Sequence, residues 1–167
     1  IFRELGYPED ESIPDLYARL ARESGSISGS RVAETYRAMI EEAEQNLDSA
    51  FDIRPTADVI VVAGGQGDYY IPASMDGKRP GAFYARVDGS TDLYAMPTLA
   101  YHETIPGHHF QIALAKESDL PLFRNVILFT GYAEGWALYA EQIAYELDWY
   151  DDDPYGNLGR LRDQAFR

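Results

Sequence analysis

All three histidines of the chain fall within eight consecutive residues, at positions 102, 108 and 109. Glu103 directly follows the first of them. Imidazole and carboxylate groups are the ordinary ligands of catalytic zinc, and a glutamate beside a histidine ligand is a ready general base. Because the chain has no cysteine, a transition-metal site would have to use these two ligand types. The pattern indicates zinc-hydrolase chemistry with Glu103 as the base.

The spacing of the histidines excludes a regular helix as the metal site. In the common His-Glu-x-x-His motif the two histidines are four residues apart and share one helix face. Here the fourth position after His102 is Pro106. A six-residue step leaves His108 about 120° round the helix, and a seven-residue step carries His109 about 10.5 Å along the axis. Imidazoles placed in this way cannot share an ion at bond lengths of about 2.0–2.1 Å.

Pro106 and Gly107 supply the irregularity that such a site needs. Proline lacks the N–H that would bond the carbonyl of His102, and its ring crowds that carbonyl. Glycine tolerates the backbone angles of a break. We therefore predict that a helix starting near residue 97 breaks here, and that His108 returns to the place of a one-turn histidine. Chance clustering of histidines on a polar helix is the alternative, and an unbroken helix from His102 to Gln111 would favour it.

A second helix, largely apolar, is predicted from residue 131 to about residue 148, and two glutamates interrupt it. Glu134 and Glu141 are seven residues apart and so share a face. Carboxylates on an apolar helix need partners, and a catalytic zinc ion takes three protein ligands plus water. We expect Glu134 to be the third ligand and Glu141 to orient a histidine. Pairing of either glutamate with Arg or Lys is the alternative.

Three segments are strand candidates, at 58–63, 68–71 and 81–87. The third contains Gly81, Ala82, Phe83 and Tyr84 and precedes the first histidine. In many zinc peptidases a strand edge beside the metal holds the substrate backbone by strand addition, so these residues form a candidate substrate strand. An ordinary strand inside a sheet fits the sequence equally well.

The fold class expected from these elements is α+β and predominantly helical, with a small antiparallel sheet beside a zincin-like pair of active-site helices. The 167 residues would form one domain. Within it we distinguish a helical lead-in (1–52), a small sheet region (53–95) and a helical metal-site region (96–167). Residues 25–30 are expected to form a flexible connector, and residues 121–129 a short helix packed beneath the site. The absence of an initial methionine suggests a piece of a longer protein.

The composition narrows the choice of partners. Asp and Glu number 28 against 14 Lys and Arg, a net charge of −14, which argues against nucleic acid or an anionic membrane as a partner. No apolar run reaches the 18 or so residues of a membrane span. The lack of cysteine leaves the compartment open. Asp151–Asp153 lacks the alternating ligands of a calcium loop, so we interpret it as a solvated turn. Glu41, Glu42 and Glu44 are expected to form the solvated face of their helix.

Two segments, His102–Gln111 and Glu134–Glu141, together with Asp76–Tyr84, resemble the bacterial family known as domain of unknown function 885. The resemblance covers roughly residues 69–141. That family is grouped with the gluzincin-type zinc peptidases, related to thermolysin and the Taq-type carboxypeptidases. Its members tend to be several hundred residues long and mostly helical, and some are described as lipoproteins. The resemblance thus implies a bacterial protein, periplasmic or lipid-anchored, with a cytoplasmic location left open.

The resemblance also implies roles for particular residues. His102, His108 and Glu134 would bind Zn²⁺, and Glu103 would be the base. The position of His109 varies in the family, with tyrosine common there, so His109 is expected to support a ligand rather than to be one. The departure from strict His-Glu-x-x-His spacing makes peptidase activity an inference by relationship.

The function expected is a zinc-dependent metallopeptidase acting on a peptide or small amide. A group must stabilise the oxyanion, and Tyr84, Tyr132 and Tyr139 are candidates among which the sequence does not choose. A zinc amidase or esterase acting on a non-peptide small molecule would use the same ligands. A metal-stabilised or degenerate binding module is the alternative of another class, and Glu103 argues against it because a structural site needs no base. The oligomeric state is not predicted.

Overall fold

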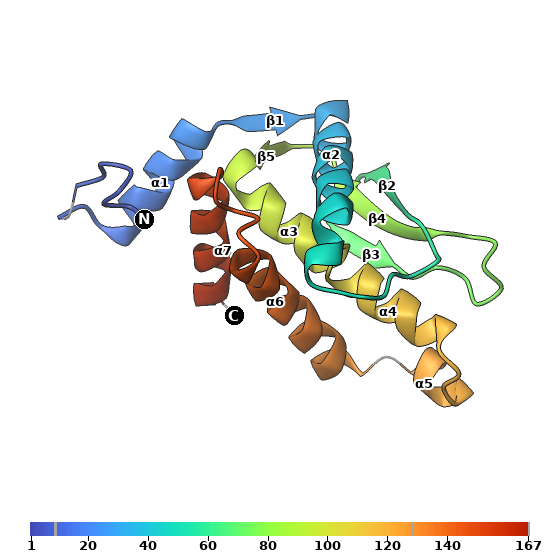
Figure 1. The fold of residues 1–167 in the computed structure, drawn as a ribbon. Coiled ribbons are helices and arrows are strands. Elements are labelled where there is room, and N and C mark those ends of the chain that lie inside the picture. Colours follow the sequence, from blue (N-terminus) through green and yellow to red (C-terminus); the bar gives the residue numbers. More distant parts are fainter. Residues whose placement is uncertain (9, 128, 167) are drawn as a thin grey trace.

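Helices carry most of the fold, and two small sheets lie among them (Figure 1). The computed structural model describes residues 1–8, 10–127 and 129–166. The predicted α+β class is confirmed, and so are the helices expected near residues 31–51 and 131–148; Arg167 lies outside the described residues. The helices are α1 (Ile13–Ser24), α2 (Ser30–Asn46), α3 (Met96–Glu103), α4 (His108–Glu117), α5 (Leu122–Val126), α6 (Thr130–Glu146) and α7 (Pro154–Phe166), with 3-10 turns η1 (Leu47–Ser49) and η2 (Leu93–Ala95).

The larger sheet has three strands in the order β2 (Val59–Gly64), β4 (Gly81–Arg86), β3 (Tyr69–Ile71). β4 runs parallel to β2 and antiparallel to β3. The expectation of a purely antiparallel sheet is therefore wrong. The reason is the path of the chain. After β2 the chain forms β3 at the opposite edge of the sheet and then returns through residues 72–80 to form β4 between the two. Strand propensity identifies the segments that form strands, but it does not show which strands pair with one another.

A smaller sheet joins the lead-in to the end of the sheet region, just before α3. β1 (Ser26–Ser28) pairs antiparallel with β5 (Ser90–Asp92). The expectation of a flexible connector at residues 25–30 is thus wrong for its middle part. Ile27 is buried in the main core, which explains why this short polar segment is extended. The pairing fixes α2 relative to the segment that leads into α3.

The position of β4 corrects the candidate substrate strand. Gly81, Ala82, Phe83 and Tyr84 lie in the central strand, where β2 pairs with one side and β3 with the other. A substrate cannot add to a strand whose two edges are already paired. β2 and β3 are the edge strands of this sheet, and β3 lines the cavity that His102 and His108 also line.

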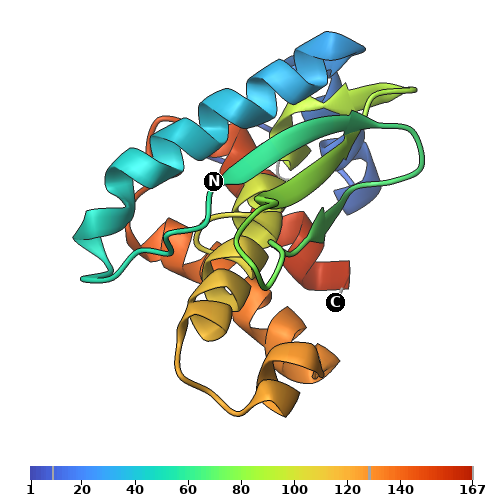
Figure 2. The same cartoon turned by 90° about the vertical axis from the view of Figure 1, so that its right-hand side faces the viewer.

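The main core lies between α2, the larger sheet and α3. α2 crosses one face of the sheet, as Figure 2 shows, and buries Tyr36 edge-on against Phe83 of β4, with ring centroids 4.9 Å apart. Met96 and Ala100 of α3 are fully buried in the same cluster. Burial of large side chains on this scale stabilises by about 1.5–3 kcal/mol each, so α3 is firmly held at its N-terminal half.

A second cluster fixes α3, α4 and α6 to one another. Tyr101 and Ile105 pack with Phe110 of α4, Ala144 of α6 and the following Tyr150. α5, by contrast, has no buried residue, and the expectation that it packs beneath the site is wrong. It is a short helix beyond the C-terminal end of α4 (Figure 1), and its apolar side chains Leu122, Phe123 and Val126 are exposed. No helix of the described residues is long and apolar enough to cross a bilayer.

Candidate metal centre

The helix break at Pro106 and Gly107 is confirmed. α3 ends at Glu103, α4 begins at His108, and the Ile105–Pro106 peptide bond is cis. A Cβ on Gly107 would collide with the backbone carbonyls of Tyr101 and His102, so glycine is required where the chain passes over the end of α3. The backbone N–H of Phe110 bonds the carbonyl of Thr104 at 3.2 Å and closes the turn.

Three predicted ligands converge at this break. Nε2 of His102 lies 3.4 Å from one carboxylate oxygen of Glu134, and Nε2 of His108 lies 3.5 Å from the other. One ligand atom from each of the three residues lies within 4.8 Å of the others. The two imidazole rings meet edge to face, with centroids 4.8 Å apart. The six-residue spacing is thus compatible with one shared site.

Glu141 lies on α6, about two turns after Glu134, and contacts the side of the His102 ring that faces away from Glu134. Its Oε1 is 2.7 Å from Nδ1 of His102, and its side chain is fully buried. A carboxylate only accepts, so Nδ1 carries a proton, and Nε2 is the ring nitrogen that faces Glu134. Of the two expectations for Glu141, orientation of a histidine is the one that agrees with the geometry, rather than pairing with Arg or Lys.

Glu103 is buried at the same cavity. The pKa of its carboxyl is raised to about 7, mainly by burial and in part by the charge of nearby Glu134, while His102 and the backbone N–H of Tyr70 oppose the rise. A pKa near neutrality suits a group that accepts and returns a proton. Burial also lowers the pKa of His108, which keeps that imidazole neutral and able to donate a lone pair.

His109 points away from the three ligands and is held from both sides. Its Nε2 donates to the carbonyl of Ala57 at 3.0 Å, and its Nδ1 accepts from the hydroxyl of Tyr70 at 2.9 Å. Burial lowers the pKa of His109 to about 4. A Cβ on Gly81 would collide with this Tyr70–His109 pair, which gives Gly81 a packing role in place of the expected substrate contact.

The ligands and Glu103 open into a cavity of about 230 Å³. The other lining residues come from β3, the segment after it and α4: Tyr69, Tyr70, Pro72 and Ile112. None of the tyrosines suggested for oxyanion stabilisation lines it. Tyr84 stacks on Tyr69 in the sheet, whereas Tyr132 and Tyr139 are exposed on α6.

Sequence reasoning missed two residues that shape this centre. Tyr70 connects β3 to Glu103 through its backbone and to His109 through its hydroxyl. Trp136, two residues after Glu134, donates from its indole N–H to the carbonyl of Pro106 at 2.8 Å. The spacing from Glu134 to Trp136 was visible in the sequence, but nothing there indicated a bond to the helix break.

The donor set fits a zinc ion. Two neutral imidazoles and one carboxylate are a known catalytic combination, and they leave a fourth position for water. Bonds of about 2.0–2.1 Å in a tetrahedral site place neighbouring ligand atoms about 3.4 Å apart. The distances from the two imidazoles to the two different oxygens of Glu134 are 3.4 and 3.5 Å, whereas one ligand atom from each of the three residues lies within 4.8 Å of the others, so the three side chains would draw closer together around an ion.

Comparison with known proteins places the chain in a family. A search of curated proteins gave no significant match. The chain is similar to the crystal structure of "the putative lipoprotein from Colwellia psychrerythraea", with a TM-score of 0.88 and 30% sequence identity. The alignment covers 99% of this chain and 31% of that one, so the chain spans about a third of that protein's length. The model of the family described as bacterial protein of unknown function (DUF885) matches residues 1–167. The chain therefore belongs to the bacterial DUF885 family.

Proposed function

We propose that the protein is a zinc-dependent hydrolase, and specifically a metallopeptidase. The observation that carries this proposal is the convergence of His102, His108 and Glu134 at one cavity that Glu103 also lines. A purely structural metal site has no use for a buried carboxyl group with a pKa near 7 beside its three ligands. The arrangement resembles that of gluzincin-type peptidases, and we infer the relationship from it.

The residues divide the chemical work. A zinc ion bound by the three ligands would lower the pKa of water and polarise a carbonyl. Glu103 takes a proton from the attacking water and passes it to the leaving amine, which its raised pKa favours. Glu141 holds the imidazole of His102 in the tautomer whose Nε2 can serve as a ligand.

The substrate backbone would lie along β3 rather than β4. β3 is an edge strand of its sheet, and its Tyr69 and Tyr70 line the cavity. An extended peptide can pair with such an edge through main-chain hydrogen bonds. Tyr69, Pro72 and Ile112 would give the cavity an apolar wall, which favours an apolar side chain next to the scissile bond.

Turnover of a peptide library tests the proposal. We expect the zinc-loaded protein in its full natural length to cleave peptides, and Glu103→Gln to lower kcat about 10²- to 10⁴-fold with zinc content unchanged. Glu34→Gln, an exposed glutamate on α2, is the matched control and should be fully active. Bound zinc without turnover of any peptide would favour a binding module, and turnover of only non-peptide amides or esters would favour the small-molecule hydrolase.

The location of the protein is a further part of the proposal. The Colwellia relative is described as a lipoprotein, and this chain aligns with a third of it. We infer that the natural protein is attached to a membrane by a lipid anchor and acts outside the cytoplasm. Fractionation of cells that produce the full-length protein would test this, and recovery in the cytosol alone would contradict it.

A further inference from the structure

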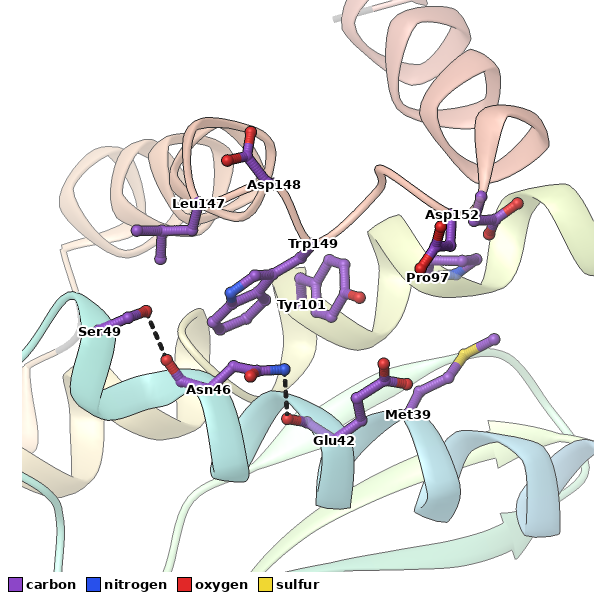
Figure 3. Close-up of a pocket in the computed structure, with 11 residues that line it drawn as sticks. Met39, Glu42, Asn46, Ser49, Pro97, Tyr101, Leu147, Asp148, Trp149 and Asp152 are labelled. Atoms are coloured by element: carbon purple, nitrogen blue, oxygen red, sulfur yellow. Dashed lines mark hydrogen bonds between the residues drawn. The ribbon is translucent and has the colours of Figure 1, made fainter.

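A second pocket lies on another side of α3, away from the metal centre. It has a volume of about 390 Å³ and is bounded by α2, α3 and the α6–α7 connection (Figure 3). The two cavities have no lining residue in common. Tyr101 and His102 are consecutive on α3, and successive helix residues point about 100° apart. Tyr101 therefore lines the second pocket, while His102 lines the cavity of the metal centre. A ligand in this pocket would not occupy the metal site.

Tyr101 is the polar group at the centre of this pocket. Its side chain is only 7% exposed, and its hydroxyl has no hydrogen-bond partner among the described residues. The ring is fixed by edge-to-face contacts with Trp149 and Tyr150, at centroid distances of 5.3 and 5.5 Å. The hydroxyl is thus free to accept a hydrogen bond from a ligand in the pocket, and a bond of this kind contributes about 0.5–1.5 kcal/mol.

The pocket is acidic, and no cation of the protein lines it. Glu42 of α2 and Asp152 and Asp153 of the α6–α7 connection contribute carboxylates, while the lining set has no Lys, Arg or His among the described residues. Neither Glu42 nor Asp152 forms a salt bridge within residues 1–8, 10–127 and 129–166. Glu42 and Asp153 both act on Tyr101, since their charges add to burial in raising the pKa of its phenol.

The remaining walls are aromatic and apolar. Trp149 and Tyr101 lie side by side between α2 and the connection, with Met39 and Pro97 on the other side of the pocket (Figure 3). Aromatic faces attract organic cations, by about 0.5–2 kcal/mol each. Carboxylates combined with aromatic walls thus favour a cation that carries carbon.

The same residues do not suit a metal ion. Among the described residues, the group of acidic and histidine side chains close enough to share an ion is the one at His102, His108 and Glu134. Of the carboxylates that line the second pocket, no three form such a group within the part of the chain that the structure describes. They match an elongated cation that reaches several of them, rather than a single ion that needs all its ligands within bonding distance.

We propose that this pocket binds an aliphatic amine in its ammonium form, with Glu42 and Asp152 as charge partners, the hydroxyl of Tyr101 as hydrogen-bond acceptor and Trp149 as the aromatic wall. The volume is in the range of small-molecule sites. The site is separate from the proposed zinc centre, so it stands whether or not the protein proves to be a peptidase.

Calorimetric titration of the full-length protein with spermidine tests the assignment, and the part of the tryptophan fluorescence change that is lost in Trp149→Phe gives a second signal. We expect one saturable site in buffer of physiological ionic strength. Glu42→Gln and Asp152→Asn should each weaken binding about three- to tenfold. Their matched controls are Glu41→Gln and Asp151→Asn, which remove the same charge at adjacent exposed positions outside the pocket and should change affinity less than about twofold.

Tyr101→Phe keeps the ring and removes only the hydroxyl, and it should weaken binding about threefold without loss of fold. Equal losses in the lining and control variants would mean general attraction to an acidic surface and would overturn the proposal. So would displacement of spermidine by Mg²⁺ at equal charge concentration, or the absence of saturable binding up to about 10 mM.

Discussion

Nδ1 of His102 donates a hydrogen bond to Oε1 of Glu141 at 2.7 Å, and no part of Glu141 reaches the surface. This contact sets the tautomer of His102 before any metal arrives, because the carboxylate can only accept. It also ties the first ligand on α3 to α6, the helix that provides Glu134. The proposed site is therefore held by a contact that spans its two halves.

Replacing Glu141 should weaken metal binding more than it weakens the fold. Glu141→Gln retains a hydrogen-bond acceptor but loses the charge that makes His102 a better ligand, and outer partners of this kind contribute about 10- to 100-fold in metal affinity. We expect the Kd for zinc, measured by competition with a chelator, to rise by at least about tenfold. Glu146→Gln, at the exposed end of α6, should leave it unchanged, and equal affinities for the two variants would refute the role of Glu141.

Gly107 should tolerate no side chain. In Gly107→Ala the new methyl group meets the carbonyls of Tyr101 and His102, so the break must rearrange at a cost of about 3 kcal/mol or more in the free energy of unfolding. Gly135→Ala is the matched control, because nothing lies within 4 Å of the added Cβ in the interior of α6. There alanine should stabilise by about 0.5–1 kcal/mol. Urea unfolding of both variants in the metal-free state measures these free energies. Similar unfolding free energies for the two variants would show that the break is not constrained as described.

His109 should make the metal-free protein sensitive to acid. Its folded pKa of about 4 lies below the ordinary value of 6.5, so between these values the unfolded state binds a proton that the native state does not. The stability is thus complete above pH 6.5 and is lost as the pH falls toward 4. Between pH 7.5 and pH 5 the loss should be about 2 kcal/mol.

The variant His109→Gln isolates this effect. It removes the titrating group, so its unfolding free energy should fall less than that of the wild-type protein over the same pH interval. Urea unfolding in the presence of a chelator measures both. A parallel pH dependence for the two proteins would show that His109 is not the group responsible.

Trp136 should stabilise the helix break through one hydrogen bond. Trp136→Phe retains an aromatic ring against Phe110 but removes the donor to the carbonyl of Pro106. We expect a loss of about 1–3 kcal/mol in unfolding free energy, together with weaker zinc binding, because the break carries His108. Unchanged zinc affinity would separate this residue from the site.

The clustering of the candidate ligands could be predicted because their residue types are rare and their spacing is restrictive. Three histidines beside a glutamate and a Pro-Gly pair indicate a broken helix, and the break is where the structure has it. The strand order could not be predicted. Residues 81–86 show strand propensity, but whether that strand is central or at an edge depends on pairings far apart in the chain, as with Val59 and Gly81.

Supporting residues were likewise out of reach of sequence patterns. The hydroxyl of Tyr70 bonds His109, 39 positions away, and the indole of Trp136 bonds the carbonyl of Pro106, 30 positions away. No local period or motif marks such contacts. The exposed position of α5 could not be predicted either. A short apolar run such as residues 121–129 is typical of a buried helix, and the sequence does not show whether other elements cover it.

The central claim is that His102, His108 and Glu134 bind one zinc ion. Crystals of the zinc-loaded, full-length protein, measured above and below the zinc absorption edge, test it most directly. We predict one anomalous peak about 2.0–2.2 Å from Nε2 of both histidines and from a carboxylate oxygen of Glu134. A fully loaded crystal with no peak there, or with a peak that these side chains do not touch, would contradict the account.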